Sequence, residues 1–311
     1  MTLEEVLSHP PSVLSVEQRA AYFEQGYLKL ENWVSENWIE RLRAASHRII
    51  ERSRSVTASN EMFVLDEGHS ATSPRLRRLN CAVDYDSSFW AYASESALPD
   101  VAADLVGPDV KFRESLINFK WARGGDEVRW HQDLVYYPHT NTSPLLMLTC
   151  LEEVKSDQAP LMVVPGSHRL GMLDHYDGER WLGRICDEAL TKVDLQQAVP
   201  MTGPPGTLIV LHGCVVHGSR KNLSDRNRPM LTCGYSSADA FSYTPLPAGN
   251  ISKHIWKIVR GSPAKFAHHE AMRCRIPPDY SHAYTSIFEM QKGISRSVAG
   301  LRANQLDRSG R

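Results

Sequence analysis

The chain has 311 residues, of which 42% are hydrophobic and 23% are charged, a globular composition that excludes intrinsic disorder as the main state. Its 35 basic residues balance 36 acidic ones for a formal net charge of −1, which argues against a nucleic-acid partner. No apolar run approaches the roughly 18 residues of a membrane span, and the N-terminus lacks the basic and apolar regions of a signal peptide.

The N-terminal part, about residues 1–110, is expected to be helical. Ser15 with Gln18 three residues later matches a capping box that starts a helix, and Gly26 ends that helix. Residues 27–30 alternate as a short strand does, and a second helix is expected after Ser35, where apolar residues recur at helical spacing. Residues 55–75 are polar and predict a loop.

A core of about residues 110–245 has the pattern of an all-β domain. Short apolar runs alternate with glycine and proline, which is typical of an antiparallel barrel or a double-sheet jelly roll. Residues 171–197 predict a helical insertion in this core. A C-terminal extension, 246–311, follows, with helical potential over 262–293 and a loose tail in the last dozen residues. Because no linker separates these parts, we expect one domain over residues 1–311.

The six cysteines favour a reducing compartment. None stands in a Cys-x-x-Cys pair, and Cys150 and Cys214 lie inside apolar stretches. Cysteines in such surroundings are usually buried and reduced. We therefore expect a cytoplasmic protein.

Three residues have the types and spacing of a metal site. His131 and Asp133 are two positions apart, so on a strand both side chains project from one face. A lone His-x-Asp is more often structural than metal-binding, but His217, which ends a second apolar stretch, is the best candidate for a third ligand. Two histidines and one carboxylate form a facial triad that leaves three positions of an octahedral ion open, the arrangement of non-haem Fe(II) oxygenases.

An arginine that could bind a carboxylate follows the triad in the sequence. Arg228 stands at the start of the apolar stretch after His217, and its planar guanidinium can bind a carboxylate through two parallel hydrogen bonds. Arg226 is the alternative. Aromatic residues close to the motif are candidates for the wall of a substrate pocket: Trp121, Tyr136 and Tyr137. Structural roles are expected for His168, His212 and Cys214.

Five segments together carry a family resemblance. They are EQRAAYFEQGYLKL at 17–30, INFK at 117–120, HQDLVYYP at 131–138, APLMVVPGSH at 159–168 and HGSRKNLSDRNR at 217–228. In this order the sequence resembles the phytanoyl-CoA dioxygenase family of Fe(II)- and 2-oxoglutarate-dependent oxygenases. The resemblance implies a cupin-like, double-stranded β-helix form of the jelly roll.

The resemblance also implies cofactors and the residues that bind them. Fe(II) is expected on His131, Asp133 and His217, with 2-oxoglutarate as co-substrate and O2 as oxidant. Co-substrate contacts are implied for Arg228, Thr149, Ser219 and Asn118. Thr149 replaces a bulky aromatic residue of phytanoyl-CoA dioxygenase itself, which argues against an acyl-CoA substrate.

The activity implied by the resemblance is hydroxylation of an unactivated C–H bond in a small-molecule metabolite, with formation of succinate and CO2. Related halogenases have a small residue in place of the carboxylate, so Asp133 favours hydroxylation over halogenation. Desaturation and other oxidative outcomes stay open. Two further hypotheses are a cupin-like metal isomerase or lyase that does not use 2-oxoglutarate, and a non-catalytic module that binds iron or 2-oxoglutarate.

Overall fold

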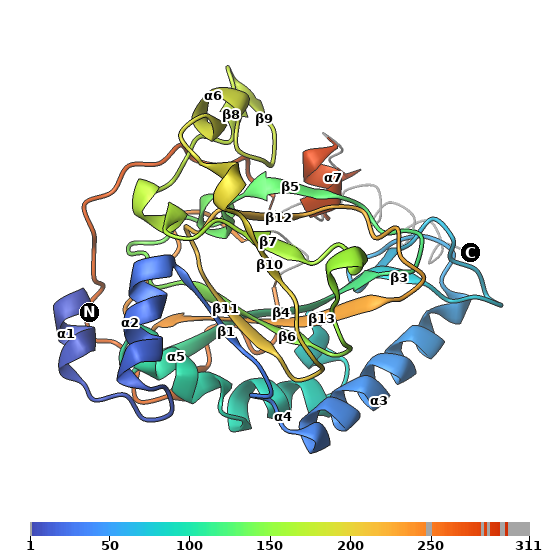
Figure 1. The fold of residues 1–311 in the computed structure, drawn as a ribbon, viewed down its shortest axis with the longest axis horizontal. Coiled ribbons are helices and arrows are strands. Elements are labelled where there is room, and N and C mark those ends of the chain that lie inside the picture. The colour runs from blue at the N-terminus through green and yellow to red at the C-terminus, as the bar shows by residue number, and fades with distance from the viewer. Residues whose placement is uncertain (1, 247–250, 281–282, 285–286, 293–295, 298–311) are drawn as a thin grey trace, which may run out of the picture.

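The computed structural model describes residues 2–246, 251–280, 283–284, 287–292 and 296–297. Two antiparallel β-sheets face each other at its centre, and helices of the N-terminal part cover the outer side of the larger sheet (Figure 1). This is the jelly-roll core that the sequence predicts. No helix among the described residues is long and apolar enough to cross a membrane.

The N-terminal helices form where the capping signals place them. The Ser15 hydroxyl accepts a hydrogen bond from the Gln18 amide, the Gln18 side chain accepts one from the Ser15 amide, and Gly26 ends the helix in the left-handed conformation at φ 78°. The helices are α1 (Leu3–Ser8), α2 (Val16–Gln25), α3 (Glu36–Arg52), α4 (Ser87–Glu95) and α5 (Leu98–Val106). The expected loop at 55–75 also contains a short strand, so that part of the prediction is incomplete.

The larger sheet carries both the helix-facing core and the floor of the site. Its strands in spatial order are β1 (Tyr27–Leu30), β11 (Leu208–His212), β6 (Leu145–Cys150), β13 (Arg228–Ser237), β4 (Val110–Lys120), β3 (Leu76–Asn80) and β2 (Phe63–Leu65), and β14 (Ile258–Arg260) also pairs with β4. Successive side chains of a strand point to opposite faces. Met147 and Leu231 therefore pack on the helices, while Leu148 and Met230 face the smaller sheet.

The smaller sheet lies across the interior from these residues. Its order is β10 (Val199–Met201), β7 (Leu161–Val163), β12 (His217–Ser219) and β5 (Val128–His131). The apolar stretch before His217 does not form one strand. β11 ends at His212 in the larger sheet, a turn follows, and β12 begins at His217 in the smaller sheet. The chain thus crosses between the sheets directly before its proposed third ligand.

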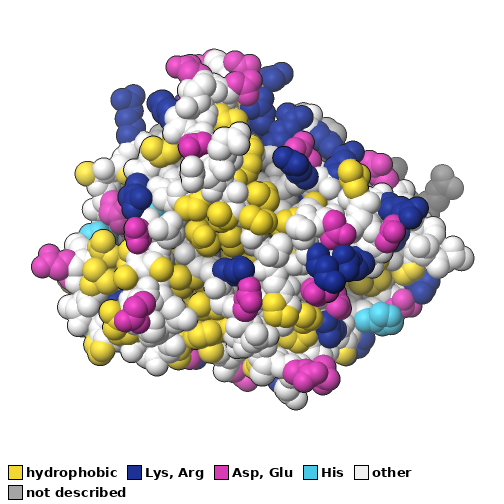
Figure 2. Space-filling model, in the orientation of Figure 1, with side chains coloured by type: hydrophobic (Ala, Val, Ile, Leu, Met, Phe, Trp, Pro, Cys, Tyr) yellow, Lys and Arg dark blue, Asp and Glu magenta, His cyan; other side chains and the backbone are white. Residues whose placement is uncertain are grey.

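The insertion at 171–197 is largely irregular rather than helical. It contains the two-residue strands β8 (Tyr176–Asp177) and β9 (Arg180–Trp181), the single-turn helix α6 (Asp187–Leu190) and a 3-10 turn at Leu195–Gln197. Gly178 and Gly183 adopt positive φ of 57° and 60°, and such conformations interrupt a helix. In the surface view, hydrophobic side chains gather near the centre of this face, below the projecting insertion (Figure 2). A groove there is lined in part by Pro160, Met162, Leu190, Leu195 and Pro200.

The described part of the C-terminal extension is mostly without regular structure. Within 262–293 its helical element is α7 (Ile287–Gln291), and β15 (Ala283–Tyr284) pairs with β16 (Arg296–Ser297). The tail expected in the last dozen residues lies outside the described residues.

Candidate metal centre and co-substrate pocket

The two histidines of the predicted triad meet across a strand pair. His217 on β12 is the direct partner of His131 on β5, and their ring centroids lie 4.1 Å apart. Each Nδ1 hydrogen-bonds a backbone carbonyl, His131 that of Arg129 at 2.8 Å and His217 that of Val215 at 3.0 Å. Because these bonds place the ring proton on Nδ1, both Nε2 atoms are left with a lone pair for a ligand.

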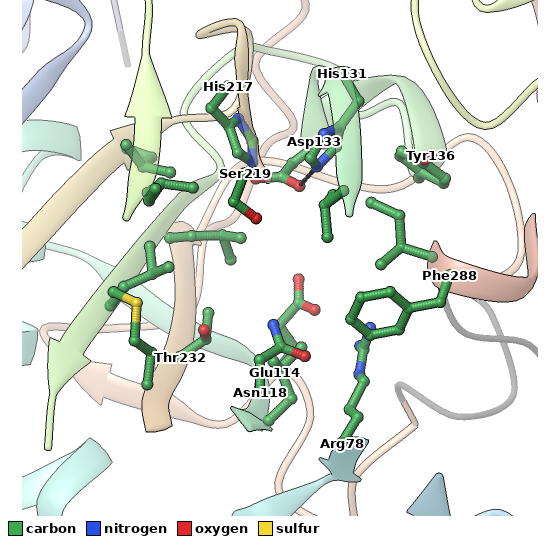
Figure 3. Close-up of a pocket in the computed structure, with 18 of the residues that line it drawn as sticks. Arg78, Glu114, Asn118, His131, Asp133, Tyr136, His217, Ser219, Thr232 and Phe288 are labelled. Atoms are coloured by element: carbon green, nitrogen blue, oxygen red, sulfur yellow. Dashed lines mark ion pairs between the residues drawn. The ribbon is translucent and has the colours of Figure 1, made fainter. Parts of the chain in front are cut away.

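Asp133 completes the group, although it does not lie on the strand. β5 ends at His131, and Asp133 opens a 3-10 turn. The residue between them, Gln132, is extended at φ −126° and ψ 133°, so the two side chains still project to the same side. Oδ1 lies 3.6 Å from His131 Nε2, and Oδ2 lies 3.6 Å from His217 Nε2. One donor atom from each of the three residues falls within 4.8 Å of the others (Figure 3).

The charges of the triad suit a divalent cation. Burial alone raises the pKa of the Asp133 carboxyl, but His217, His131 and Arg113 outweigh it and hold the pKa below its ordinary value. Burial, together with the nearby His131, lowers the pKa of His217 to about 4, so its imidazole is neutral at neutral pH. Asp133 Oδ2 is buried without a hydrogen-bond partner in the described part of the chain. A carboxylate and neutral imidazoles are the protonation states that a metal requires.

A cavity of about 130 Å³ opens between the triad and the larger sheet. Its floor comes from strands β3, β4, β6 and β13, and α7 contributes Ile287, Phe288 and Met290 to its wall. Six of the seven predicted site residues line it: Asn118, His131, Asp133, His217, Ser219 and Arg228. Tyr136 and Tyr137 also line the cavity, whereas Trp121 packs against the helix-facing core and donates to the Leu76 carbonyl.

Arg228 is buried at one end of this cavity. It is 5% exposed, its Nη1 contacts Met230 Sδ, and its Nε has no hydrogen-bond partner among the described residues. Burial lowers its pKa to about 10, so the guanidinium stays charged at neutral pH. Arg226, the alternative, instead forms an ion pair with Asp157 at the surface at 3.1 Å.

Lys120 stands directly opposite Arg228, because the two residues pair across β4 and β13. Burial and the charge of Arg228 lower the pKa of Lys120 to about 6, and its Nζ donates to the Arg220 carbonyl. At neutral pH this end of the cavity therefore carries one positive charge, that of Arg228, rather than two.

Thr149 lies on the other side of the sheet from the cavity. It is fully buried, and its hydroxyl bonds Tyr92 of α4 at 2.7 Å. A different hydroxyl, that of Thr232 on β13, points into the cavity with Asn118 and Ser219 (Figure 3). Asn118 Oδ1 is buried and has no hydrogen-bond partner in the described chain.

Three histidine and cysteine residues expected to be structural lie outside the cavity. His212 accepts a hydrogen bond from the Cys214 amide at 3.0 Å and packs against His168, and His168 hydrogen-bonds the Phe23 carbonyl at 3.1 Å. Cys214 is buried in an apolar cluster. Their hydrogen bonds and packing agree with the structural roles expected for them.

Sequence reasoning missed three charged residues of the cavity wall, Arg78, Glu114 and Lys120. Glu114 and Lys120 share a face of β4 with Asn118, so period-two alternation outward from Asn118 would have found both. No local pattern marks Arg78, which reaches the cavity from β3 because β3 pairs with β4.

Comparison with known proteins agrees with this geometry. A probable alpha-ketoglutarate-dependent hypophosphite dioxygenase of Stutzerimonas stutzeri is 28% identical over 288 residues, which cover 90% of this chain and 98% of that protein. An ectoine dioxygenase of Sphingopyxis alaskensis is 28% identical over 275 residues, or 81% and 85% of the two chains. The crystal structure of S. alaskensis EctD with 2-oxoglutarate and 5-hydroxyectoine superposes with a TM-score of 0.64, at 26% identity over 84% of this chain and 90% of that one.

The family model described as phytanoyl-CoA dioxygenase (PhyH) matches residues 22–230. That range contains the helical entry to the domain, most of the jelly-roll core, the three residues of the triad and Arg228. With the family model spanning most of the chain and the triad assembled in the cavity, the chain belongs to the phytanoyl-CoA dioxygenase family of iron- and 2-oxoglutarate-dependent oxygenases.

Proposed function

We propose that His131, Asp133 and His217 hold Fe(II) and that Arg228 anchors 2-oxoglutarate, so that the protein hydroxylates a C–H bond of a small metabolite. This proposal rests on one cavity in which two sets of polar groups, the triad donors and the Arg228 guanidinium, are incompletely paired. At one wall, two Nε2 lone pairs converge with a carboxylate oxygen that has no hydrogen-bond partner among the described residues. At one end lies a buried guanidinium whose Nε also has no partner in the described part of the chain.

The donor set fits iron better than it fits Mg²⁺ or Ca²⁺. Two imidazoles and one carboxylate match the facial triad of non-haem Fe(II) enzymes, whereas Mg²⁺ and Ca²⁺ prefer oxygen ligands throughout. When bound, iron and 2-oxoglutarate would together activate O2, one oxygen atom of which would enter the substrate C–H bond and the other succinate, with CO2 released. The backbone carbonyls of Arg129 and Val215 hold the two rings in the orientation that this requires.

The Arg228 end fits a carboxylate. Its guanidinium provides charge and a planar donor fork, and the hydroxyls of Thr232 and Ser219 line the same cavity. Asn118 offers a further polar contact on the floor. A co-substrate carboxylate bound at this end would pair with the buried Arg228 guanidinium, whose Nε has no hydrogen-bond partner among the described residues, and such pairing is favourable for a buried charge.

The size of the cavity limits the substrate. A bound water needs about 10–15 Å³ of such space, so the 130 Å³ cavity holds on the order of ten waters. Once a co-substrate occupies one end, the remainder accommodates a small molecule and not the body of an acyl-CoA. The two relatives are named for ectoine and hypophosphite, which are also small molecules.

A cytoplasmic location is part of this proposal. All six cysteines are free thiols, and four of them are buried. Reduced cysteines in this number are typical of a reducing compartment.

The test is succinate formation. Purified protein given Fe(II), 2-oxoglutarate and O2 is expected to release succinate slowly, and faster when a substrate is present. Matched protein carrying His131→Ala should release none above background. An isomerase or lyase would leave 2-oxoglutarate unconsumed, and a binding module would retain it without turnover, so either result contradicts the proposal.

A further inference from the structure

We infer that the protein forms a two-fold dimer in which the N-terminal segment of each copy, residues 2–18, binds in a groove of the other copy. The groove is the one below the insertion, on the face where hydrophobic side chains gather in Figure 2. The inference does not depend on the proposed function, because it concerns the outer surface of the protein.

The groove is an apolar surface between the smaller sheet and the insertion, with a volume of about 580 Å³. β7 and β10 contribute Met162 and Pro200, and the insertion contributes Leu190 and Leu195. Leu161, the neighbour of Met162 on β7, lines the catalytic cavity instead, as expected from alternation along a strand. The groove is therefore the outer face of the same sheet, and an exposed apolar surface of this kind is typical of an interaction site.

The rim of the groove carries an excess of positive charge. Its lining includes Arg129, Arg184 and Arg220, with Glu127 as the acidic residue among those that the structure describes. Arg184 pairs with Asp187 at 2.7 Å, and Arg129 lies 4.0 Å from Glu127. Arg220 is exposed and forms no ion pair with any described residue. We therefore expect the occupant of the groove to be both apolar and acidic.

The N-terminal segment has this complementary composition. Residues 2–18 contain Glu4, Glu5 and Glu17 but no lysine or arginine. Leu3 and Leu7 of α1 are 52% and 49% exposed, and side chains four residues apart lie on the same face of a helix. The segment thus presents two adjacent leucines beside acidic side chains.

These leucines belong to an ordered surface. Val6 of the same helix is buried, and Arg19 donates to its carbonyl. Asp104 of α5 accepts hydrogen bonds from the backbone amides of Val13 and Leu14, both at 2.9 Å. Because the segment is already held against α5, its binding to a partner costs little further conformational entropy.

The symmetry follows from the two surfaces being different. A head-to-tail chain of copies would leave an empty groove at one end and an unused segment at the other. Reciprocal exchange about a two-fold axis instead fills both grooves and closes the assembly at two copies. It also doubles the number of apolar and charged contacts, so the closed dimer is favoured.

The first test reverses the charges of each surface in the full chain and measures mass by sedimentation velocity. Arg129→Glu with Arg220→Glu reverses the groove, and Glu4→Lys with Glu17→Lys reverses the segment. Each doubly substituted protein alone is expected to dissociate with a dissociation constant raised about tenfold or more. An equimolar mixture of the two should dimerise again, because each segment then meets a groove of opposite charge. A variant that fails to fold cannot produce this recovery.

The second test removes the apolar contact. Leu3→Ser with Leu7→Ser should raise the dissociation constant of the dimer by about tenfold or more, since both side chains lose the burial gained on association. Ile251→Ser is the matched control, because Ile251 is similarly exposed at 53% and lines neither surface. The control should dimerise like the unmodified protein.

The third test locates the contact in the unmodified protein, by amide hydrogen exchange above and below the dissociation constant. Residues 2–8 and 159–163 are expected to gain protection together in the dimer. A protein that is monomeric up to its solubility limit would overturn the inference, as would a mixture of the charge-reversed variants that stays monomeric. Protection of the groove without protection of residues 2–8 would assign the groove to another occupant and would equally refute it.

Discussion

At the scale of single residues, two backbone carbonyls prepare the metal site. The carbonyls of Arg129 and Val215 accept the Nδ1 protons of His131 and His217, which fixes the tautomer and leaves both Nε2 atoms available. Asp133 adds the negative charge and an oxygen that has no hydrogen-bond partner in the described chain. These contacts direct one donor atom of each triad residue toward a common point.

Removing the carboxylate tests this organisation. Asp133→Ala is expected to lower iron affinity by about 100-fold or more, because the loss of a charged partner in a buried site costs about 2–5 kcal/mol. The residual enzyme should make succinate slowly without modifying a substrate, with or without chloride. Metal content and succinate are measured together, and Asp157→Ala at the surface serves as control. Full activity in Asp133→Ala would show that this carboxylate is not a ligand.

The two neighbouring arginines provide a second test. Arg228→Ala is expected to raise the KM for 2-oxoglutarate by about 30-fold or more, the equivalent of 2 kcal/mol for a charge-assisted pair. Arg226→Ala removes only a surface ion pair with Asp157, worth about 0–1 kcal/mol, and should leave the KM unchanged. Steady-state kinetics with both variants decides the assignment, and the opposite ranking would refute it.

At the scale of elements, strand parity decides which hydroxyl serves the cavity. On β6, Leu146 and Leu148 line the cavity, while Met147 and Thr149 face the helices. Thr149 therefore cannot take the co-substrate role that the resemblance implied. A shift of one position along a strand moves a side chain to the other face. Thr232, on the adjacent β13, stands on the correct face.

A matched pair of substitutions separates these roles. Thr232→Val is expected to raise the KM for 2-oxoglutarate several-fold, because a neutral hydrogen bond contributes about 0.5–1.5 kcal/mol. Thr149→Val should leave that KM unchanged but lower the melting temperature by about 2–4 °C, since the bond to Tyr92 is lost. Kinetics and thermal unfolding are measured on both proteins. A KM effect confined to Thr149→Val would contradict the assignment by strand face.

At the scale of the whole molecule, segments distant in sequence close the cavity. α7 brings Phe288 and Met290 to its wall, and Gln291 ties that helix down by accepting from the Arg129 amide and donating to the Gly183 carbonyl. The insertion contributes His175, which is stacked on Trp181 and accepts a hydrogen bond from the Gln132 amide between two triad residues. The stability of the fold and the geometry of the site are thereby linked.

This linkage predicts a pH dependence. Burial lowers the pKa of His175 from 6.5 to about 3, so between these pH values the unfolded chain binds a proton that the folded chain excludes. Stability should thus fall as the pH drops below about 6.5, by up to roughly 1.4 kcal/mol per pH unit for this one group. In His175→Gln, which keeps an acceptor for the Gln132 amide, the decline between pH 6.5 and 4 should be smaller. Thermal unfolding across this range measures the difference, and identical slopes would contradict it.

What the sequence determined by itself was the chemistry of the site. His131 and Asp133 project to the same side, as their spacing predicts, because Gln132 between them is extended, even though the strand ends earlier than expected. The capping box at Ser15 likewise predicts its helix, because the hydrogen bonds that start a helix are local. Short apolar runs separated by glycine and proline predicted an antiparallel barrel or a jelly roll, because turn residues are a local signal, and the family resemblance implied the jelly roll.

What only the tertiary structure decided was which side chains share one cavity. The insertion proved irregular because glycines at positive φ interrupt it. The Thr149 side chain faces away from the cavity and the Thr232 side chain faces into it, because the pairing of β6 with β13 sets the face of each. Arg78 reaches the cavity only through the register of β3 on β4, which places it opposite Asn118. These outcomes depend on hydrogen bonds between strands far apart in the chain, and local sequence does not encode that pairing.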